Sequence, residues 1–225
     1  RADIGVMITA SHNTYEYNGL KFFNKDGYKL STKIEKLVEN IVSDNKKYSK
    51  IYSKAFKSGK ALRLEDASGR YSEFLKNSLS KINNKKKLKI VLDCANGATY
   101  NIAPKIFWEL GHHVFTINDK PNGININSKC GALDTRELTQ NVLKNKADVG
   151  FAFDGDGDRI IVVDDKGNEI DGDKIIAFLC KYLIKKSKIK KKYDVIITVM
   201  SNKGLENYLQ NNLKLKIKRT SVGDI

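Results

Sequence analysis

Apolar residues along this chain follow two alternating spacings, and each spacing predicts one kind of element. Short apolar runs, which are typical of buried strands, occur at residues 4–9, 88–93, 113–117, 149–153 and 194–199. Apolar residues that recur every three or four positions, as in helices with one buried face, span residues 34–42, 71–82, 102–110, 175–184 and 204–209. Because the two kinds alternate, the pattern predicts an α/β fold with mixed sheets flanked by helices.

Individual residues refine the predicted helices. Asp134 and Glu137 have the spacing of a capping box at the start of a helix. Asp171 and Asp173 precede an apolar helix, and we expect both to cap it. Trp108 lies in an apolar helix, and we expect it to pack in the core.

Two stretches break the pattern and are candidate domain boundaries. Glycine and charge replace the periodicity at residues 57–66, and a predicted hairpin at residues 159–170 leads into a second break at residues 165–173. The chain of 225 residues starts at Arg1 almost directly with a strand, and it stops soon after another strand-like stretch. We therefore expect it to be part of a longer protein.

The chain is strongly basic, since 41 Lys and Arg against 26 Asp and Glu give a formal net charge of +15. Clustered cations bind nucleic acids, so a basic nucleic-acid-binding module is one hypothesis. Only six of the 41 are Arg, however, and the planar Arg side chain is the one that base and phosphate readers use most. We therefore expect no nucleic-acid partner and favour a surface that attracts small phosphorylated ligands.

The sequence carries no membrane or secretion signal. No apolar run reaches the roughly 18 residues of a membrane span, and no signal-peptide pattern opens the chain. Three widely spaced cysteines disfavour a disulfide framework. We therefore expect a cytoplasmic protein without a membrane partner.

An acidic loop at residues 154–159 is the strongest chemical signal, and it follows a predicted strand directly. Asp154, Asp156 and Asp158 are separated by glycines, so three like charges crowd into one tight turn. Oxygen ligands of this kind select a hard divalent ion, Mg²⁺ or Ca²⁺, over zinc. Arg159 could neutralise one carboxylate or bind a phosphate that shares the metal. The alternative is a solvated acidic turn without an ion.

The residues that follow exclude an EF-hand. Its sixth loop position is Arg159 instead of Gly, and its twelfth is Asp165 instead of Glu. The β-branched residues at 160–163 predict a strand where an EF-hand needs a helix.

A second loop, residues 9–13, follows the first predicted strand. A turn of small residues at the carboxyl end of a strand is a typical ligand site in α/β proteins, and it would leave Ser11 exposed. His12 could assist proton transfer, Asn13 could fix the turn, and Lys21 could bring a cation or a proton donor. Adjacent serine and histidine do not by themselves make a catalytic pair. Both a reactive Ser11 and a turn-forming Ser11 therefore stay open.

These two loops carry a family resemblance. The motifs Ala10-Ser11-His12-Asn13 and Asn18-Gly19-Leu20-Lys21, together with the acidic loop, resemble the α-D-phosphohexomutases. The resemblance extends over essentially the whole chain. A narrower likeness, to the branch that acts on phosphorylated glucosamine, rests on residues 93–98, 121–127, 130–131 and 221–224. Thr14 departs from the family, which usually has Pro there, but this leaves Ser11 unaffected.

The resemblance implies a role for each candidate residue. Ser11 would be the phosphoserine, and one of its phosphate oxygens would share an Mg²⁺ ion with Asp154, Asp156 and Asp158. Arg159 would contact the phosphoryl group.

Three further residues receive roles from the same resemblance. Lys21 or His12 would act as acid, base or charge stabiliser, and Asn13 would belong to the phosphate-binding residues.

The resemblance also implies a domain division. Residues 1–64 would be the C-terminal part of domain 1, residues 65–163 the complete domain 2, and residues 164–225 the N-terminal part of domain 3. The segments that select the sugar in this family would lie outside the chain.

The implied activity is an intramolecular phosphoryl transfer, which belongs to the isomerase class. A phosphoserine enzyme would interconvert glucosamine 6-phosphate and glucosamine 1-phosphate through a 1,6-bisphosphate. Alternatives are a family member acting on mannose or glucose phosphates, the nucleic-acid-binding module, and a metal-binding domain without catalysis.

Overall fold

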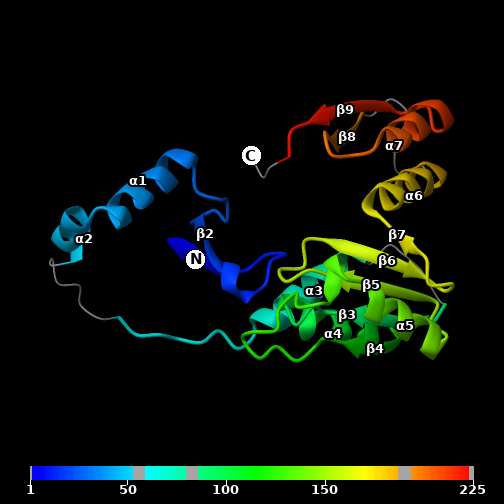
Figure 1. Cartoon of the computed structure of the whole chain (residues 1–225), viewed down its shortest axis with the longest axis horizontal. Helices are drawn as coiled ribbons and strands as arrows, with labels where there is room; N and C mark the ends of the chain where they lie inside the picture. The colour runs from blue at the N-terminus through cyan, green and yellow to red at the C-terminus, as the bar shows by residue number, and fades with distance from the viewer. Residues whose placement is uncertain (1, 53–58, 80–85, 187–193, 223–225) are drawn as a thin grey trace.

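The computed structural model describes residues 2–52, 59–79, 86–186 and 194–222. Figure 1 shows three groups of elements along the chain, each built around its own sheet. The predicted α/β class is confirmed. The end of the helix predicted over residues 71–82, part of the boundary predicted at 57–66, and the end of the motif at 221–224 lie outside the described residues.

The first region is a two-stranded sheet with two helices. Its elements in chain order are β1 (Ile4–Thr9), a 3-10 turn (Tyr15–Tyr17), β2 (Gly19–Asn24), α1 (Thr32–Ser43) and α2 (Asn45–Tyr52). The two strands are antiparallel, with Ile4 opposite Asn24 and Thr9 opposite Gly19. The strand β2 and the helix α2 were not predicted. Strand β2 was missed because its apolar residues are too few to form a recognisable apolar run. Helix α2 was missed because its many Lys residues hide the helical spacing of its apolar ones.

The central region contains a five-stranded sheet. Its elements in chain order are α3 (Ala67–Leu79), β3 (Lys89–Asp93), a 3-10 turn (Ala98–Tyr100), α4 (Ile102–Glu109), β4 (His113–Ile117), a 3-10 turn (Gly131–Leu133), α5 (Arg136–Asn145), β5 (Val149–Phe153), β6 (Ile160–Asp164) and β7 (Glu169–Ile170). The strand order is β4-β3-β5-β6-β7. Strands β4, β3 and β5 are parallel, whereas β6 and β7 form the predicted hairpin and run antiparallel. The sheet therefore continues to Ile170.

Successive residues of β3 pack into different cores because side chains alternate across a sheet. Val91 contacts a cluster that includes Leu138 and Val142 of α5. Ile90 and Leu92 belong to a second cluster with Ala103 of α4 and the aromatic residues near it. Helices therefore cover both faces of the sheet, and fully burying each such side chain stabilises the fold by about 1.5–3 kcal/mol.

The third region has its own parallel pair of strands. Its elements are α6 (Gly172–Lys185), β8 (Asp194–Thr198), α7 (Lys203–Asn207), a π-helical turn (Tyr208–Asn212) and β9 (Lys216–Thr220). Cys180, Ile197, Leu205, Leu209 and Leu215 form its buried core. In the part of the chain that the structure describes, none of the helices combines the length and the apolar character that crossing a bilayer requires.

One predicted helix start is wrong. The N-cap of α5 is Thr135, and the side chain of Asp134 accepts hydrogen bonds from the backbone and the guanidinium of Arg136 instead, at 3.3 and 2.8 Å. Glu137 accepts from the amide of Asn118 at 3.0 Å. A charged partner two residues away competes successfully with the capping box.

The prediction for the cap of α6 is confirmed in part, and the prediction for Trp108 is wrong. Asp171 caps α6 as predicted, accepting from the backbone N–H of Lys174 at 2.9 Å, but Asp173 accepts from Asn202 instead. Trp108 is 70% exposed, which contradicts the core role. The reason is helical geometry, since Trp108 lies two positions beyond the buried Ile106 and so points to the opposite side of α4.

Candidate phosphoryl-transfer and metal site

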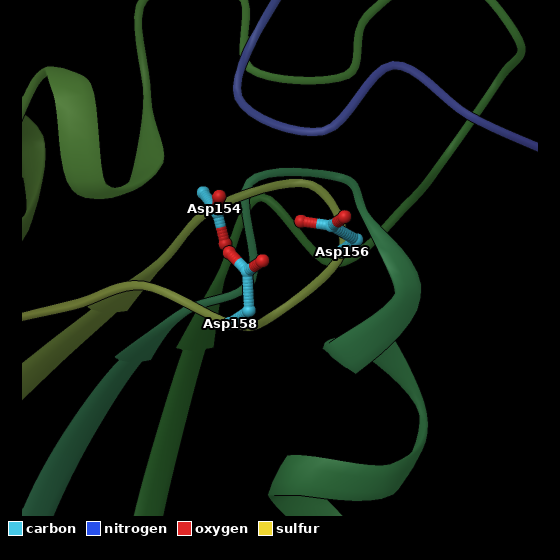
Figure 2. Close-up of side chains that lie close together, drawn as sticks. All are labelled: Asp154, Asp156 and Asp158. Carbon is cyan, nitrogen blue, oxygen red and sulfur yellow. The ribbon is translucent and has the colours of Figure 1, made fainter. Parts of the chain in front are cut away.

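The acidic loop follows β5 at the carboxyl edge of the parallel strands, as expected from the sequence. One carboxylate oxygen from each of Asp154, Asp156 and Asp158 lies within 4.8 Å of the others. Figure 2 shows the carboxylates of Asp154 and Asp158 facing each other, with that of Asp156 pointing toward them from across the loop. The predicted cluster of three aspartates therefore forms, although the three side chains differ in burial from fully buried to exposed.

Asp154 is the buried anchor of this loop. Its side chain is fully buried, and its Oδ1 accepts hydrogen bonds from the backbone N–H groups of Gly157 and Arg159, both at 3.1 Å. Burial is the main cause that raises the pKa of the Asp154 carboxyl above its usual range, and the negative charges of Asp158 and Asp156 raise it further. The loop thus holds charge that it does not itself neutralise.

Two carboxylate oxygens in the loop lack a hydrogen-bond partner although both are buried. These are Oδ2 of Asp154 and Oδ1 of Asp156. Leaving buried charged oxygens unpaired costs several kcal/mol in real proteins. A divalent cation between the carboxylates would satisfy both atoms, and its preference for oxygen ligands matches the residues present. The residues therefore fit Mg²⁺.

The turn after β1 holds Ser11 in a rare backbone conformation. Its φ of 53° lies in the left-handed region, which costs a residue with a side chain on the order of 1 kcal/mol or more. Two hydrogen bonds hold the turn: the Ser11 N–H donates to the hydroxyl of Thr9 at 2.8 Å, and the Asn13 N–H donates to the carbonyl of Ala10 at 2.9 Å. The Ser11 hydroxyl lies 3.5 Å from Nδ1 of His12, at the outer limit of a hydrogen bond.

The serine turn and the acidic loop touch each other directly. A Cβ atom placed on Gly155 would lie 2.5 Å from the carbonyl oxygen of Ser11, so the backbone fits there only because residue 155 has no side chain. Lys21, on β2, forms an ion pair with Asp156, with 2.9 Å between Nζ and Oδ2. Residues 135 positions apart are thus joined at this site.

The remaining predicted residues lie around this contact in different ways. The side chain of Arg159 is 51% exposed, and its Nε lies 3.9 Å from Oδ2 of Asp154, which is beyond hydrogen-bond distance. It can therefore swing toward a ligand. Asn13 contributes through its backbone, since its carbonyl accepts a hydrogen bond from Asn127.

Asn127 is a site residue to which the sequence assigned no role. Its amide nitrogen donates to the carbonyl oxygens of Ser11 and Asn13, at 2.9 and 2.7 Å. The sequence offered one signal, because residues 121–127 are rich in asparagine and glycine in a stretch that no periodicity explains. Nothing in that stretch, however, pointed to a partner 116 residues earlier.

Asp93 was missed as well, and it supports the whole edge of the sheet. It is fully buried at the end of β3, and its carboxylate accepts from the backbone N–H groups of Ala95 and Gly131, both at 2.9 Å. Burial is the main cause that raises its pKa, and the two backbone hydrogen bonds act in the opposite direction. The loops after β3 and β4 are thereby fixed to one carboxylate beside the acidic loop.

Comparison with known families matches three successive parts of the chain to one family. Residues 1–49 match "Phosphoglucomutase/phosphomannomutase, alpha/beta/alpha domain I", residues 69–167 match domain II, and residues 171–225 match domain III.

Curated relatives are similar over the entire chain. A phosphoglucosamine mutase from Thermodesulfovibrio yellowstonii is 49% identical over 224 residues, which cover 100% of this chain and 49% of the relative. A phosphoglucosamine mutase from Helicobacter pylori is 47% identical, with 100% and 50% covered. The chain spans about half the length of the curated relatives it matches.

Solved structures share the fold. A phosphoglucomutase/phosphomannomutase family protein from Burkholderia thailandensis superimposes with a TM-score of 0.76 at 23% identity, covering 99% of this chain and 46% of that one. Aspergillus fumigatus N-acetylphosphoglucosamine mutase, solved in complex with GlcNAc-6P and magnesium, gives a TM-score of 0.66 at 21% identity, covering 98% and 56%.

Proposed function

The chain belongs to the phosphoglucomutase/phosphomannomutase family, and from that premise we propose that it supplies the phosphoryl-transfer site of a phosphoglucosamine mutase. The observation that carries the proposal is the direct contact between the Ser11 turn and the acidic loop. A serine turn in contact with a loop of three carboxylates would supply both the nucleophile and the metal ligands that metal-assisted phosphoryl transfer uses.

The proposed reaction consists of two phosphoryl transfers in opposite directions. In the first, the bond between the phosphoserine Oγ of Ser11 and phosphorus breaks, and the 1-hydroxyl oxygen of glucosamine 6-phosphate bonds to phosphorus. The proton of that hydroxyl passes to a base, and the Oγ of Ser11 takes up a proton. In the second, the Oγ of Ser11 bonds to the 6-phosphorus of the bisphosphate and loses its proton to a base, while the bond between that phosphorus and O6 breaks. O6 takes up a proton, and glucosamine 1-phosphate leaves. Atoms and charges balance without a further reactant.

The chain's own residues position these groups. Asp154, Asp156 and Asp158 would hold Mg²⁺, which when bound spreads the negative charge on the transferring group. His12 lies near enough to the Ser11 hydroxyl to take and return its proton. Lys21 sits against Asp156 and would stabilise charge on the phosphoryl oxygens.

Two further residues complete the proposed phosphate site. The half-exposed Arg159 would offer the transferring phosphoryl group a planar pair of donors. Asn13 would help to bind the phosphate from the same turn that carries Ser11.

The proposed sugar is phosphorylated glucosamine. Relatives named phosphoglucosamine mutase are 46–49% identical over the full chain, which favours this substrate over mannose or glucose phosphates. A structural neighbour was solved with GlcNAc-6P and magnesium, and a phosphorylated amino sugar with Mg²⁺ would suit this acidic loop also.

The decisive change is Ser11→Ala, tested in the whole protein. It removes the hydroxyl that accepts the phosphoryl group, and we expect mutase turnover to fall by at least about 10³-fold, the size of effect seen when a nucleophile is removed. Intact mass should show a covalently bound phosphoryl group on the wild type and none on the variant. Turnover is measured with glucosamine 6-phosphate and glucose 6-phosphate in parallel.

Ser128→Ala is the matched control, because Ser128 is exposed in a neighbouring loop. It should keep both the activity and the phosphoryl group. Wild-type turnover in Ser11→Ala would refute the phosphoserine mechanism. A preference for the glucose substrate would refute the choice of sugar while leaving the mechanism in place.

A further inference from the structure

We infer that Asn127 is a positioning residue that holds the Ser11 turn in place against the acidic loop. The inference rests on the proposed function, in which Ser11 carries the phosphoryl group. It assigns a role to a residue in the asparagine-rich stretch 121–127.

The Asn127 side chain bridges two residues of the turn. Its amide group donates one hydrogen bond to the carbonyl of Ser11 and one to the carbonyl of Asn13, at 2.9 and 2.7 Å. These two carbonyls flank His12. Both amide hydrogens are therefore used on the segment that carries the proposed nucleophile and the proposed base.

The backbone of Asn127 is anchored to the central sheet. Asn127 is 7% exposed, its φ is 55°, and its N–H donates to the carbonyl of Ala95 at 2.9 Å. Ala95 is in turn held by the buried carboxylate of Asp93 at the end of β3. A short chain of hydrogen bonds therefore leads from the sheet, through Asn127, to Ser11.

A carboxamide suits this position better than the alternatives. Aspartate has the same shape but no N–H donor, so its oxygen would face two carbonyl oxygens. A longer side chain has no room, because a Cβ atom on Gly155 would already lie 2.7 Å from Nδ2 of Asn127. Asparagine also tolerates the left-handed backbone that this residue adopts.

The position of Ser11 depends on such a contact because its own region offers little packing. Among residues 2–50, only Ala10 is buried. A displacement of about 1 Å at the reacting atoms can cost on the order of a hundredfold in rate. Loss of the Asn127 hydrogen bonds should therefore lower kcat, while the KM for the sugar phosphate should change little because both amide donors of Asn127 are used on the turn.

The test compares Asn127→Gly and Asn127→Asp with the wild type in the whole protein. Glycine removes the carboxamide and accepts the left-handed backbone without strain, and aspartate keeps the shape while losing both donors. We expect kcat to fall by about 10- to 100-fold in both. Hydrogen exchange at residues 10–14 should be faster in both, and this readout does not depend on catalysis.

Lys129→Gly is the matched control. Lys129 also has a left-handed backbone, with φ 55°, two residues after Asn127, but its side chain is exposed. We expect wild-type kcat and wild-type exchange at residues 10–14. If Asn127→Gly fails to fold, the aspartate variant alone decides the outcome.

Unchanged kcat and unchanged exchange at residues 10–14 in the Asn127 variants would overturn the inference, as would a rise in KM alone. A wild type that lacks mutase activity would instead refute the proposed function, and the exchange data would still test whether Asn127 positions the turn.

Discussion

The first and central regions of this protein differ sharply in packing, yet each provides half of the site. In the first region, alternate residues of β1 present their side chains to solvent, and Ile4, Val6 and Ile8 are 54%, 53% and 70% exposed. In the central region, Val91 and Leu92 of β3 are fully buried, with helices on both faces of the sheet. The serine turn therefore extends from a loosely packed hairpin, and the acidic loop from a rigid sheet.

This difference shows where the geometry of the site originates. A packed sheet holds a loop at its edge because moving that loop would disturb many buried contacts. The Ser11 turn has little such packing within its own region. It is held by contacts with the central region, namely those with Asn127 and Gly155 and the ion pair of Lys21 with Asp156. The position of Ser11, the proposed nucleophile, thus depends on the contact between the two regions.

The largest effect should come from truncating the central core. Leu138 is fully buried on α5 against the sheet, and Leu138→Ala should lower the free energy of unfolding by about 2–5 kcal/mol, because it leaves a cavity. Leu37→Ala on α1 removes a side chain that is 58% exposed, and we expect about 0.5 kcal/mol or less. Urea unfolding followed by circular dichroism measures both.

Hydrogen exchange assigns each change to a region. Leu138→Ala should speed exchange in α5 and the sheet, and Leu37→Ala should leave those segments unchanged. Equal losses of stability in the two variants would mean that the first region is as well packed as the central one, and the comparison would fail.

Sequence predicted the central region better than the first for the same physical reason. Strand β3 is buried over residues 90–93, and β5 buries every second residue, so both carry nearly continuous apolar runs that are easy to recognise. Strand β2 was missed because it is half-exposed and carries polar residues among its apolar ones. Helix α2, with Lys46, Lys47 and Lys50, shows no strong apolar stripe.

The site was predictable where its chemistry is local. The three aspartates lie within five residues of sequence and can be recognised as a cluster from their spacing, and Ser11 can be recognised from the motif around it. Asn127, Gly155 and Asp93 act through contacts with distant backbone, at 116 residues in the case of Asn127. A single sequence carries no record of which backbone a side chain meets, so these roles required the structure.

The next effect should come from Gly155→Ala. An added Cβ would lie 2.5 Å from the carbonyl of Ser11 and 2.8 Å from Ile126, so the serine turn must move away. We expect kcat to fall by about a hundredfold, equivalent to about 2.7 kcal/mol of transition-state stabilisation. Stability of the central region should change much less, because the added methyl group meets the first region and a loop.

Gly69→Ala is the control for this substitution, since a Cβ there meets open space on α3. It should keep wild-type kcat. Wild-type activity in Gly155→Ala would show that the two regions can separate without affecting the site. It would contradict the claim that the position of Ser11 depends on the contact between them.

The smallest effect should separate packing from surface charge as the source of the difference. Hydrogen bonds from Arg136 lower the pKa of Asp134 to about 2, and a backbone hydrogen bond from Lys47 is the main cause that lowers the pKa of Asp44 in the first region. A lowered folded-state pKa stabilises the fold above the unfolded pKa, and this contribution is lost as the pH falls through the folded pKa. Asp134→Asn should therefore flatten the loss of stability between about pH 4 and pH 2, and Asp44→Asn should act in the same direction.

Urea unfolding at several pH values, with hydrogen exchange to resolve the regions, measures this change. If only one substitution changed the loss of stability at low pH, the two regions would differ in surface electrostatics as well as in packing. Similar small changes in both variants would leave core packing as the difference between the regions.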